Sequence, residues 1–534
     1  MLGEMWTLRG RYKILHLTWF AFFLTFVVWF NLAPLATQVQ ADFGLEVGQI
    51  RTLAICNVAL TVPARIIIGM LLDKYGPRIT YTLLLMYAAI PCIIFATAQN
   101  FNQLLISRLA LGIVGAGFVI GIRMVAEWFP PKEIGLAEGI YGGWGNFGSA
   151  AAAFTLPAIA GWLAFGAINP QTGEALLNWR VCIAGTGIIA ALYGIFYFFN
   201  VQDHPPGKVY RKPKNARGIE VTTPKDFWFL LLMNIPLSGI LMVLAWRLKK
   251  LGLYDVNTLY IVWTFLVGLY LFQAYNCWVA NKDLMTGKKR YPADDRYNFS
   301  QVAILELTYF VNFGSELAVV SMLPAFFEGT FTLSPAQAGM IASTYAFMNL
   351  MSRPGGGLIS DKLGSRKNTM GVLTLGMGIG YLFMGSMNNN SWLPLAVILT
   401  MGCSFFVQAG EGSTFAIVPL IKRRITGQIA GNVGAYGNVG AVAYLTIFSL
   451  LPEWLGGGAK PTPEIIGQAN TAFFQLMGIA AVVVAFLCWF FLKEPKGSFA
   501  DTTKEKKNRK PFIMTLSYKL ILPWSLLILF PEVK

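Results

Sequence analysis

The stretch that decides the fold reads Arg65-Ile-Ile-Ile-Gly-Met-Leu-Leu-Asp-Lys-Tyr-Gly-Pro-Arg78. A second copy reads Arg353-Pro-Gly-Gly-Gly-Leu-Ile-Ser-Asp-Lys-Leu-Gly-Ser-Arg366, and each matched position lies 288 residues after its counterpart. Two upstream positions repeat at the same interval, with Leu45 and Gln49 recurring as Leu333 and Gln337. Repetition in register over this distance indicates two halves built on one plan.

Composition places both halves in a membrane. The 534 residues are 55% hydrophobic and 13% charged, with a mean hydropathy of +0.55, which excludes an ordinary soluble globular protein. A crossing helix needs about 20 apolar residues. Such runs predict an all-α polytopic protein with twelve spans at residues 14–38, 50–72, 79–98, 103–128, 134–165, 180–200, 302–328, 336–359, 369–388, 393–420, 426–453 and 470–492. We therefore expect six-helix bundles at residues 1–200 and 301–493.

The linker between the bundles, residues 201–300, holds two additional apolar runs at 227–246 and 258–281. Their lengths favour two further spans. The alternative is a re-entrant or interfacial hairpin, because a crossing would place the basic residues after the first run on the outer side, against the charge rule. The tail, residues 494–534, is basic and has a short apolar end.

Charge sets the expected orientation. The net charge of +16 comes from basic residues in short connectors on one side, with no continuous stripe of the kind that binds nucleic acid. The positive-inside rule therefore predicts a multi-pass protein of the cell membrane with both termini cytoplasmic. All six cysteines lie inside apolar runs, so we expect small core residues and no metal site.

A second duplication, at an interval of 292, consists of glycines three residues apart. Gly139, Gly142, Gly145 and Gly148 recur as Gly431, Gly434, Gly437 and Gly440. Such a column is a groove into which a neighbouring helix can pack closely and along which it can slide. Ordinary packing on small residues explains the glycines equally well, but not the asparagine that each copy holds at the same place, Asn146 and Asn438.

Arg65 and Arg353 are the main candidates for function. Each lies eight residues, about 12 Å of helix, before the aspartate of its loop, Asp73 or Asp361. A charge at that depth costs on the order of 2.5 kcal/mol or more. Two halves of parallel topology place a substrate site near the midplane between them. We therefore expect the paired guanidinium groups to bind one anion, the alternative being that each arginine pairs with an acid and locks helices.

Candidate acids within the predicted spans are Glu127, Glu306, Glu316 and Glu411. None of them repeats at 288 or 292, which favours the anion site over symmetric locks, and Glu127 has Arg123 as an i,i+4 partner. If transport is coupled to protons, one carboxylate must change its protonation, because arginine stays charged. Glu316 is the first candidate and Glu411 the second. The two histidines, His16 and His204, lie near predicted span ends and build no catalytic site, so we expect no enzyme.

These motifs resemble those of the major facilitator superfamily. The loop signature, with Asp73, Arg78, Asp361 and Arg366, is similar to the superfamily's loop after the second helix and its copy after the eighth. The stretches Ala137–Gly148 and Ala430–Ala441 resemble the two signatures of the nitrate/nitrite porter family, and most closely its cyanobacterial NrtP-type permeases, which are related to NarK-type porters. The resemblance covers nearly all of residues 14–492.

The resemblance implies nitrate and nitrite as substrates. Arg65 and Arg353 would clamp the anion, while Asn146 and Tyr309 would donate to its oxygens. Phe26, Phe118 and Phe313 would line the planar ion, and Gly142 would flank it with backbone. The other glycines and Asn438 would serve helix packing and gating. It implies a monomeric transport unit in lipid, protons as a further partner if the cycle is proton-coupled, and no cofactor. Exchange of phosphate for an organic phosphate, and an anion sensor, are the alternatives.

Overall fold

The computed structural model describes residues 6–166, 177–208, 210, 213, 217–250, 252–293, 295–457, 462–495 and 497. Within these residues the secondary structure is helical and contains no strand. The apolar end of the tail, 512–530, lies outside the described residues. The first half contains α1 (Gly10–Trp29), α2 (Ala36–Phe43), α3 (Val47–Ala59), α4 (Thr61–Tyr75), α5 (Pro77–Ala96), α6 (Phe101–Leu111), α7 (Gly117–Trp128), α8 (Ile134–Trp162) and α9 (Trp179–Asn200).

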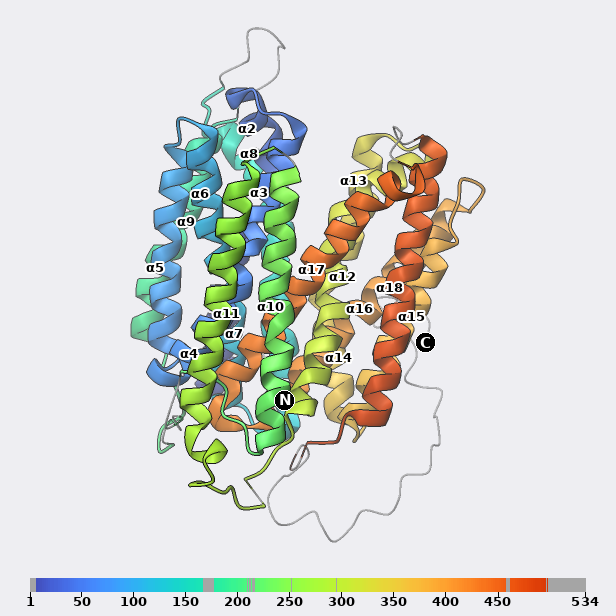
Figure 1. Ribbon diagram of the computed structural model, residues 1–534. Helices are drawn as coiled ribbons and strands as arrows, with labels where there is room; N and C mark the ends of the chain where they lie inside the picture. Colours follow the sequence, from blue (N-terminus) through green and yellow to red (C-terminus); the bar gives the residue numbers. More distant parts are fainter. Residues whose placement is uncertain are drawn as a thin grey trace, which may run out of the picture. The chain divides into compact units, whose positions relative to one another are not determined.

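The second half follows a helical hairpin. The hairpin consists of α10 (Pro224–Lys250) and α11 (Val256–Met285). The second half then contains α12 (Phe299–Phe331), α13 (Pro335–Phe347), α14 (Asn349–Lys362), α15 (Arg366–Gly385), α16 (Leu393–Ile421), α17 (Thr426–Leu455) and α18 (Pro463–Phe491) (Figure 1). Short 3-10 turns lie at Ala33–Leu35, Gly112–Ala116, Pro131–Glu133 and Arg423–Ile425. Every predicted span coincides with one helix or with consecutive helical segments.

The second span of each half breaks at an equivalent residue. The first half breaks at Leu60, between α3 and α4, and the second at Met348, between α13 and α14, 288 positions later. Both broken spans also begin with a capping box, in which the side chains of Gln49 and Gln337 accept from the backbone of Glu46 (2.9 Å) and Ser334 (3.2 Å). A capping box satisfies amides that a helix start leaves without partners, which explains why the glutamine repeats.

The halves meet at the end of the helices that carries the Asp73 and Asp361 turns, called here the motif end. There α8 packs along α14, and α17 crosses toward α4, as the ribbon shows (Figure 1). The contact is close because glycines face each other: a Cβ on Gly69 would lie 2.4 Å from the carbonyl oxygen of Gly427, and one on Gly357 would lie 1.9 Å from that of Gly135. The sequence therefore allows backbone-to-backbone packing between the halves at this end.

The hairpin runs the full length of the bundle. The end of α10 lies beside the end of α17, where Lys250 Nζ donates to Glu453 at 2.8 and 2.9 Å. Because α17 starts at the motif end, this ion pair lies at the opposite end, called here the distal end. The hairpin therefore extends from one end to the other and back, as expected for two additional spans.

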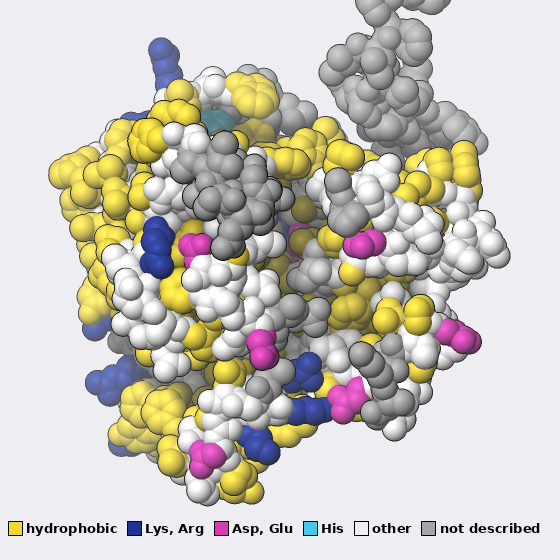
Figure 2. Space-filling model, turned by 90° about the horizontal axis from the view of Figure 1, so that it is seen from above, with side chains coloured by type: hydrophobic (Ala, Val, Ile, Leu, Met, Phe, Trp, Pro, Cys, Tyr) yellow, Lys and Arg dark blue, Asp and Glu magenta, His cyan; other side chains and the backbone are white. Residues whose placement is uncertain are grey.

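Eleven helices among the described residues are long and apolar enough to cross a membrane, α10 and α11 among them. The glycine-rich segments α8, α13 to α14 and α15 are not in that group. Seen from the distal end, hydrophobic side chains form much of the rim, and acidic and basic side chains are scattered over the face (Figure 2). This distribution fits a lipid-facing perimeter with polar ends.

Candidate functional site

Arg65 lies on α4 and is fully buried at the contact between the halves. Its Nε donates to the carbonyl of Gly115 (3.3 Å), and its Nη1 donates to the carbonyl of Gly434 on α17 of the other half. Nη2 has no hydrogen-bond partner among the described residues. Arg65 therefore offers a positive charge and an open donor, held in place by backbone carbonyls and not by an acid.

Arg353 lies on α14 and has a different environment. Its Nη2 forms ion pairs with Glu411 on α16 and with Glu316 on α12, the latter at 3.4 Å. With its amide oxygen turned toward Arg353, Asn146 accepts from Nη1 (3.0 Å) and Nη2 (2.7 Å). The two arginines occupy equivalent places in the sequence, but only Arg353 is neutralised by carboxylates.

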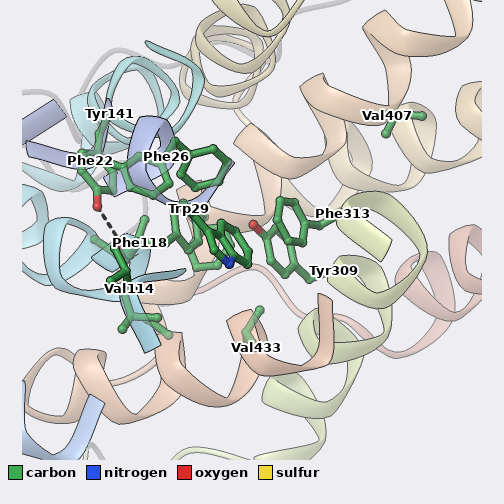
Figure 3. Close-up of a cluster of buried hydrophobic side chains, with 14 of the residues drawn as sticks. Phe22, Phe26, Trp29, Val114, Phe118, Tyr141, Tyr309, Phe313, Val407 and Val433 are labelled. Carbon is green, nitrogen blue, oxygen red and sulfur yellow. Dashed lines mark hydrogen bonds between the residues drawn. The ribbon is translucent and has the colours of Figure 1, made fainter. Parts of the chain in front are cut away.

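Aromatic rings from both halves frame the two guanidinium groups. Tyr309 stacks on Phe118 at 5.9 Å and on Phe313 at 5.1 Å, with interplanar angles of 4° and 2° (Figure 3). The Cζ atom of Arg65 lies 5.4 and 5.3 Å from the ring centres of Phe118 and Phe313, and that of Arg353 lies 6.0 and 5.8 Å away. The Tyr309 hydroxyl, also without a partner among the described residues, is close enough to both arginines to interact with their charges.

The structure brings together most of the residues predicted for the site. Gly142 lies against Arg353, since a Cβ added there would meet Nη1 at 3.1 Å. Phe26 is the exception: it packs on Phe22 (4.7 Å) and Trp29 (5.3 Å), behind the ring that contacts Phe118 (Figure 3). Phe26 therefore supports Phe118 indirectly, through Phe22.

The glycines of α8 and α17 form two groups, one that lies against the other half and one that lies against its own half. In α8, a Cβ on Gly139 would lie 2.5 Å from the carbonyl oxygen of Arg353, and in α17 a Cβ on Gly431 would lie 2.5 Å from that of Arg65. The later glycines face their own half: Gly145 and Gly148 lie against α1, and Gly437 and Gly440 against α12. Asn438 donates to the carbonyl of Gly434 at 3.3 Å. The same carbonyl oxygen also accepts from Arg65. Each column thus makes room for the arginine of the other half.

The loop motifs join the halves at the motif end. Asp73 accepts from the amides of Gly427 and Gln428 at the start of α17, both at 3.0 Å. Asp361 accepts from the amides of Gly135 and Leu136 at the start of α8, at 3.0 and 2.7 Å. A carboxylate at a helix N-terminus satisfies free amides and meets the positive end of the helix dipole. These two contacts close the motif end.

The arginines of the two motifs differ. Arg366 pairs with its own Asp361 at 2.7 Å, whereas Arg78 lies over the ring of Phe198 at 4.5 Å. Beside Asp73 the cation is instead Arg123 of α7, 3.8 Å away, which also pairs with Glu127 (2.9 Å) and donates to the carbonyl of Arg423. Arg123 is therefore part of the contact between the halves, and Glu127 pairs with it on the same helix.

Charged groups of the linker reinforce the start of α17. Arg424 binds Glu220 at 2.6 Å and Asp295 at 2.9 Å, and Lys289 lies 3.5 Å from Glu220. Burial disfavours the charged form of both carboxylates, but the hydrogen bonds and charges of these cations outweigh it, so the pKa of Glu220 and the pKa of Asp295 both lie below their ordinary values. The linker is therefore tied to the helix that closes the motif end.

Sequence reasoning missed a buried, unpartnered carboxylate inside a predicted span. Glu138, on α8, is 2% exposed and neither of its oxygens has a hydrogen-bond partner among the described residues. It lies inside the glycine-rich stretch that was interpreted as packing, so its charge was overlooked. A test for acids within every predicted span would have found it.

Comparison with known proteins places these features in a family. The family model described as "Major Facilitator Superfamily" matches residues 18–281 and 305–531. The chain is 69% identical to the nitrate/nitrite transporter NrtP of Picosynechococcus sp. and 56% identical to that of Nostoc punctiforme, in each case over 94% of this chain and 96% of the relative. High-affinity nitrate transporter 2.3 of Oryza sativa subsp. japonica is 29% identical over 82% of this chain and 72% of its own length.

A solved structure supports the same fold. The proton:xylose symporter XylE, at 16% identity, superimposes with a TM-score of 0.57 over 91% of this chain and 97% of its own. At this identity the likeness concerns the fold alone. Together with the family match and the internal duplication, it shows that the chain belongs to the major facilitator superfamily.

Proposed function

We propose that this protein transports nitrate and nitrite across the cell membrane by alternating access around Arg65 and Arg353. The observation that carries the proposal is the meeting of these two arginines, one from each half, between Phe118 and Phe313. The substrates follow from the high identity to two transporters named for nitrate and nitrite.

The chemistry of the site suits a small planar anion. Nη2 of Arg65, Nε of Arg353 and the hydroxyl of Tyr309 are donors without partners among the described residues. Guanidinium groups stay charged and present planar pairs of donors to an oxyanion. Nitrate is flat, singly charged and weakly hydrated, so a few donors between aromatic faces suffice for it, whereas phosphate would require more.

The motif end is the cytoplasmic end in this proposal, because the basic connectors lie there. The structure then corresponds to the state closed toward the cytoplasm. Opening requires Asp73 and Asp361 to release the helix starts that they cap, and it separates α4 from α17 and α8 from α14. Each of these helix pairs contains one arginine and the glycine that contacts it, so anion binding and gating share residues.

Asn146 has a more specific role than donation to the anion. In the closed arrangement its oxygen accepts from both Nη atoms of Arg353. We assign it the task of aiming that guanidinium, with its amide nitrogen remaining as a donor toward the anion.

Uptake in cells that lack their own nitrate system tests the function. Labelled nitrate should enter, and unlabelled nitrite should compete whereas phosphate should not. Competition by phosphate and an organic phosphate, but not by nitrite, would support the exchanger alternative. Anion binding without any flux in proteoliposomes would instead support a sensor.

A further inference from the structure

Glu306 is a carboxyl that the anion site does not use. It lies on α12, is fully buried, and has no hydrogen-bond or ion-pair partner for either oxygen among the described residues. The two other buried glutamates described in the second half, Glu316 and Glu411, both pair with Arg353. Burying an unpaired carboxylate costs far more than burying the neutral acid, so the acid form is the one that this environment stabilises.

Two polar, uncharged side chains of α17 lie beside Glu306. They are Asn432, the polar neighbour of the carboxyl, and Tyr436, whose hydroxyl donates to the carbonyl of Met233 at 2.6 Å. From α10 comes Asn234, which accepts from Asn432 at 3.5 Å.

A small cavity with room for about one water molecule adjoins Asn432, the polar neighbour of Glu306. The hairpin contributes Asn234, Gln273 and Cys277 to its wall, and α17 contributes Gln428 and Asn432. Both amide atoms of Gln428 are buried without a partner among the described residues. Ile66 and Met70 of α4 form the opposite wall. The cavity is therefore closed by the same pair of helices, α4 and α17, that closes the motif end.

We propose that Glu306 is a proton-binding site linked to the gate at the motif end. While α4 and α17 are in contact, the carboxyl is dry and holds its proton. When the two helices separate, water reaches the carboxyl past Asn432, the O–H bond breaks, the proton passes to that water, and the carboxylate is solvated. The reverse step is needed before the end can close again.

The proposal fixes the direction in which pH shifts the gate at the motif end. Because the closed arrangement holds the proton and the open one releases it, raising the pH on the motif-end side favours opening. Glutamine has the shape of the neutral acid and no proton to lose, so Glu306→Gln should remain in the closed arrangement over the whole pH range. Asp in place of Glu306 keeps the titratable group and should restore the pH dependence.

Infrared difference spectroscopy tests the proton directly. The full-length protein in lipid nanodiscs at neutral pH should show the C=O stretch of a buried carboxylic acid, which disappears in Glu306→Gln. The variant Glu138→Gln assigns any band from the other unpartnered carboxyl. A spectrum without a band that depends on Glu306 overturns the proposal.

Spin labels across the gate test the linkage. Tyr75 and Leu363 are exposed at the motif ends of α4 and α14, and the six native cysteines are buried, so cysteines introduced at these two positions can be labelled selectively. The long-distance population should rise with pH in the otherwise unchanged protein and in Glu306→Asp, but not in Glu306→Gln. An identical pH response in Glu306→Gln, or a response to sodium in place of pH, overturns the proposal.

This inference rests on the transport cycle proposed above. Nitrate binding to the same samples reports on the anion site separately, because Glu306 makes no contact with either arginine.

Discussion

The guanidinium of Arg353 forms an ion pair with Glu411, and this contact distinguishes it from Arg65, its equivalent 288 residues earlier. Arg65 is held by the carbonyls of Gly115 and Gly434 instead. The acid lock that the sequence offered as an alternative is therefore present at Arg353 and not at Arg65, and the anion clamp remains the proposal for both. An anion that binds to both arginines must share Arg353 with carboxylates.

Replacing either arginine by lysine should abolish nitrate uptake. Lysine keeps the charge but cannot present planar paired donors. The loss of one charge-assisted hydrogen bond, about 1.5–3 kcal/mol, lowers affinity by about tenfold or more. Uptake and nitrate binding should be measured for Arg65→Lys and Arg353→Lys. Arg180→Lys serves as a control, since Arg180 donates to the carbonyls of Ala96 and Ala98 away from the pair. Normal uptake by either site variant would contradict the clamp.

Methyl groups in the glycine columns should slow transport. At Gly142 and Gly434 a leucine would collide with Arg353 or Arg65, so it would disturb the site as well as the packing. Gly139→Ala and Gly431→Ala are the sharper test, because their Cβ atoms would lie 2.5 Å from a backbone oxygen of the other half. We expect slow exchange with little change in nitrate affinity. At Gly402 a Cβ has open space, so Gly402→Ala should cycle normally. Equal rates in all three would mean that these columns tolerate wider spacing.

The sequence predicted the helices and the pairing of the halves well, because duplication and hydropathy are properties of each segment. The contacts of single polar residues were harder to predict. The pairing of Arg353 with Glu411 depends on how α14 and α16 rotate against each other, and no repeat signals it. The cation beside Asp73 is Arg123 rather than the motif's own Arg78, because α7 packs against this end of α4. Neither choice is encoded in a local pattern.

Acidification should loosen the linker before it affects the bundles. The pKa of Glu220 and that of Asp295 lie below their ordinary values, so their stabilisation is fully present above the unfolded pKa values of about 4. It is lost as the pH falls through the lower folded values. Between about pH 5 and 3, thermal stability of the purified protein should fall more steeply for the wild type than for a Glu220→Gln, Asp295→Asn double variant. Parallel curves would mean that the contacts with Arg424 contribute nothing to stability.

Proton coupling should depend on the carboxylates that share Arg353. With both acids ionised, their charges balance those of the two arginines, and the site has no net attraction for an anion. Protonation of Glu316 or Glu411 releases one interaction of Arg353, so an anion and a proton should load together. Glu316 also accepts from Asn349 (2.5 Å) and Gln408 (3.4 Å), groups that can hold it after the arginine has turned to the anion.

In proteoliposomes without internal nitrite, an imposed inward proton gradient should drive nitrate accumulation. Glu316→Gln should remove that dependence while nitrate counterflow persists. Glu328→Gln, an exposed position on the same helix, should behave as the wild type. Nitrate entry that requires internal nitrite and ignores the proton gradient would show instead that the protein exchanges the two anions and that both carboxylates serve only to position Arg353.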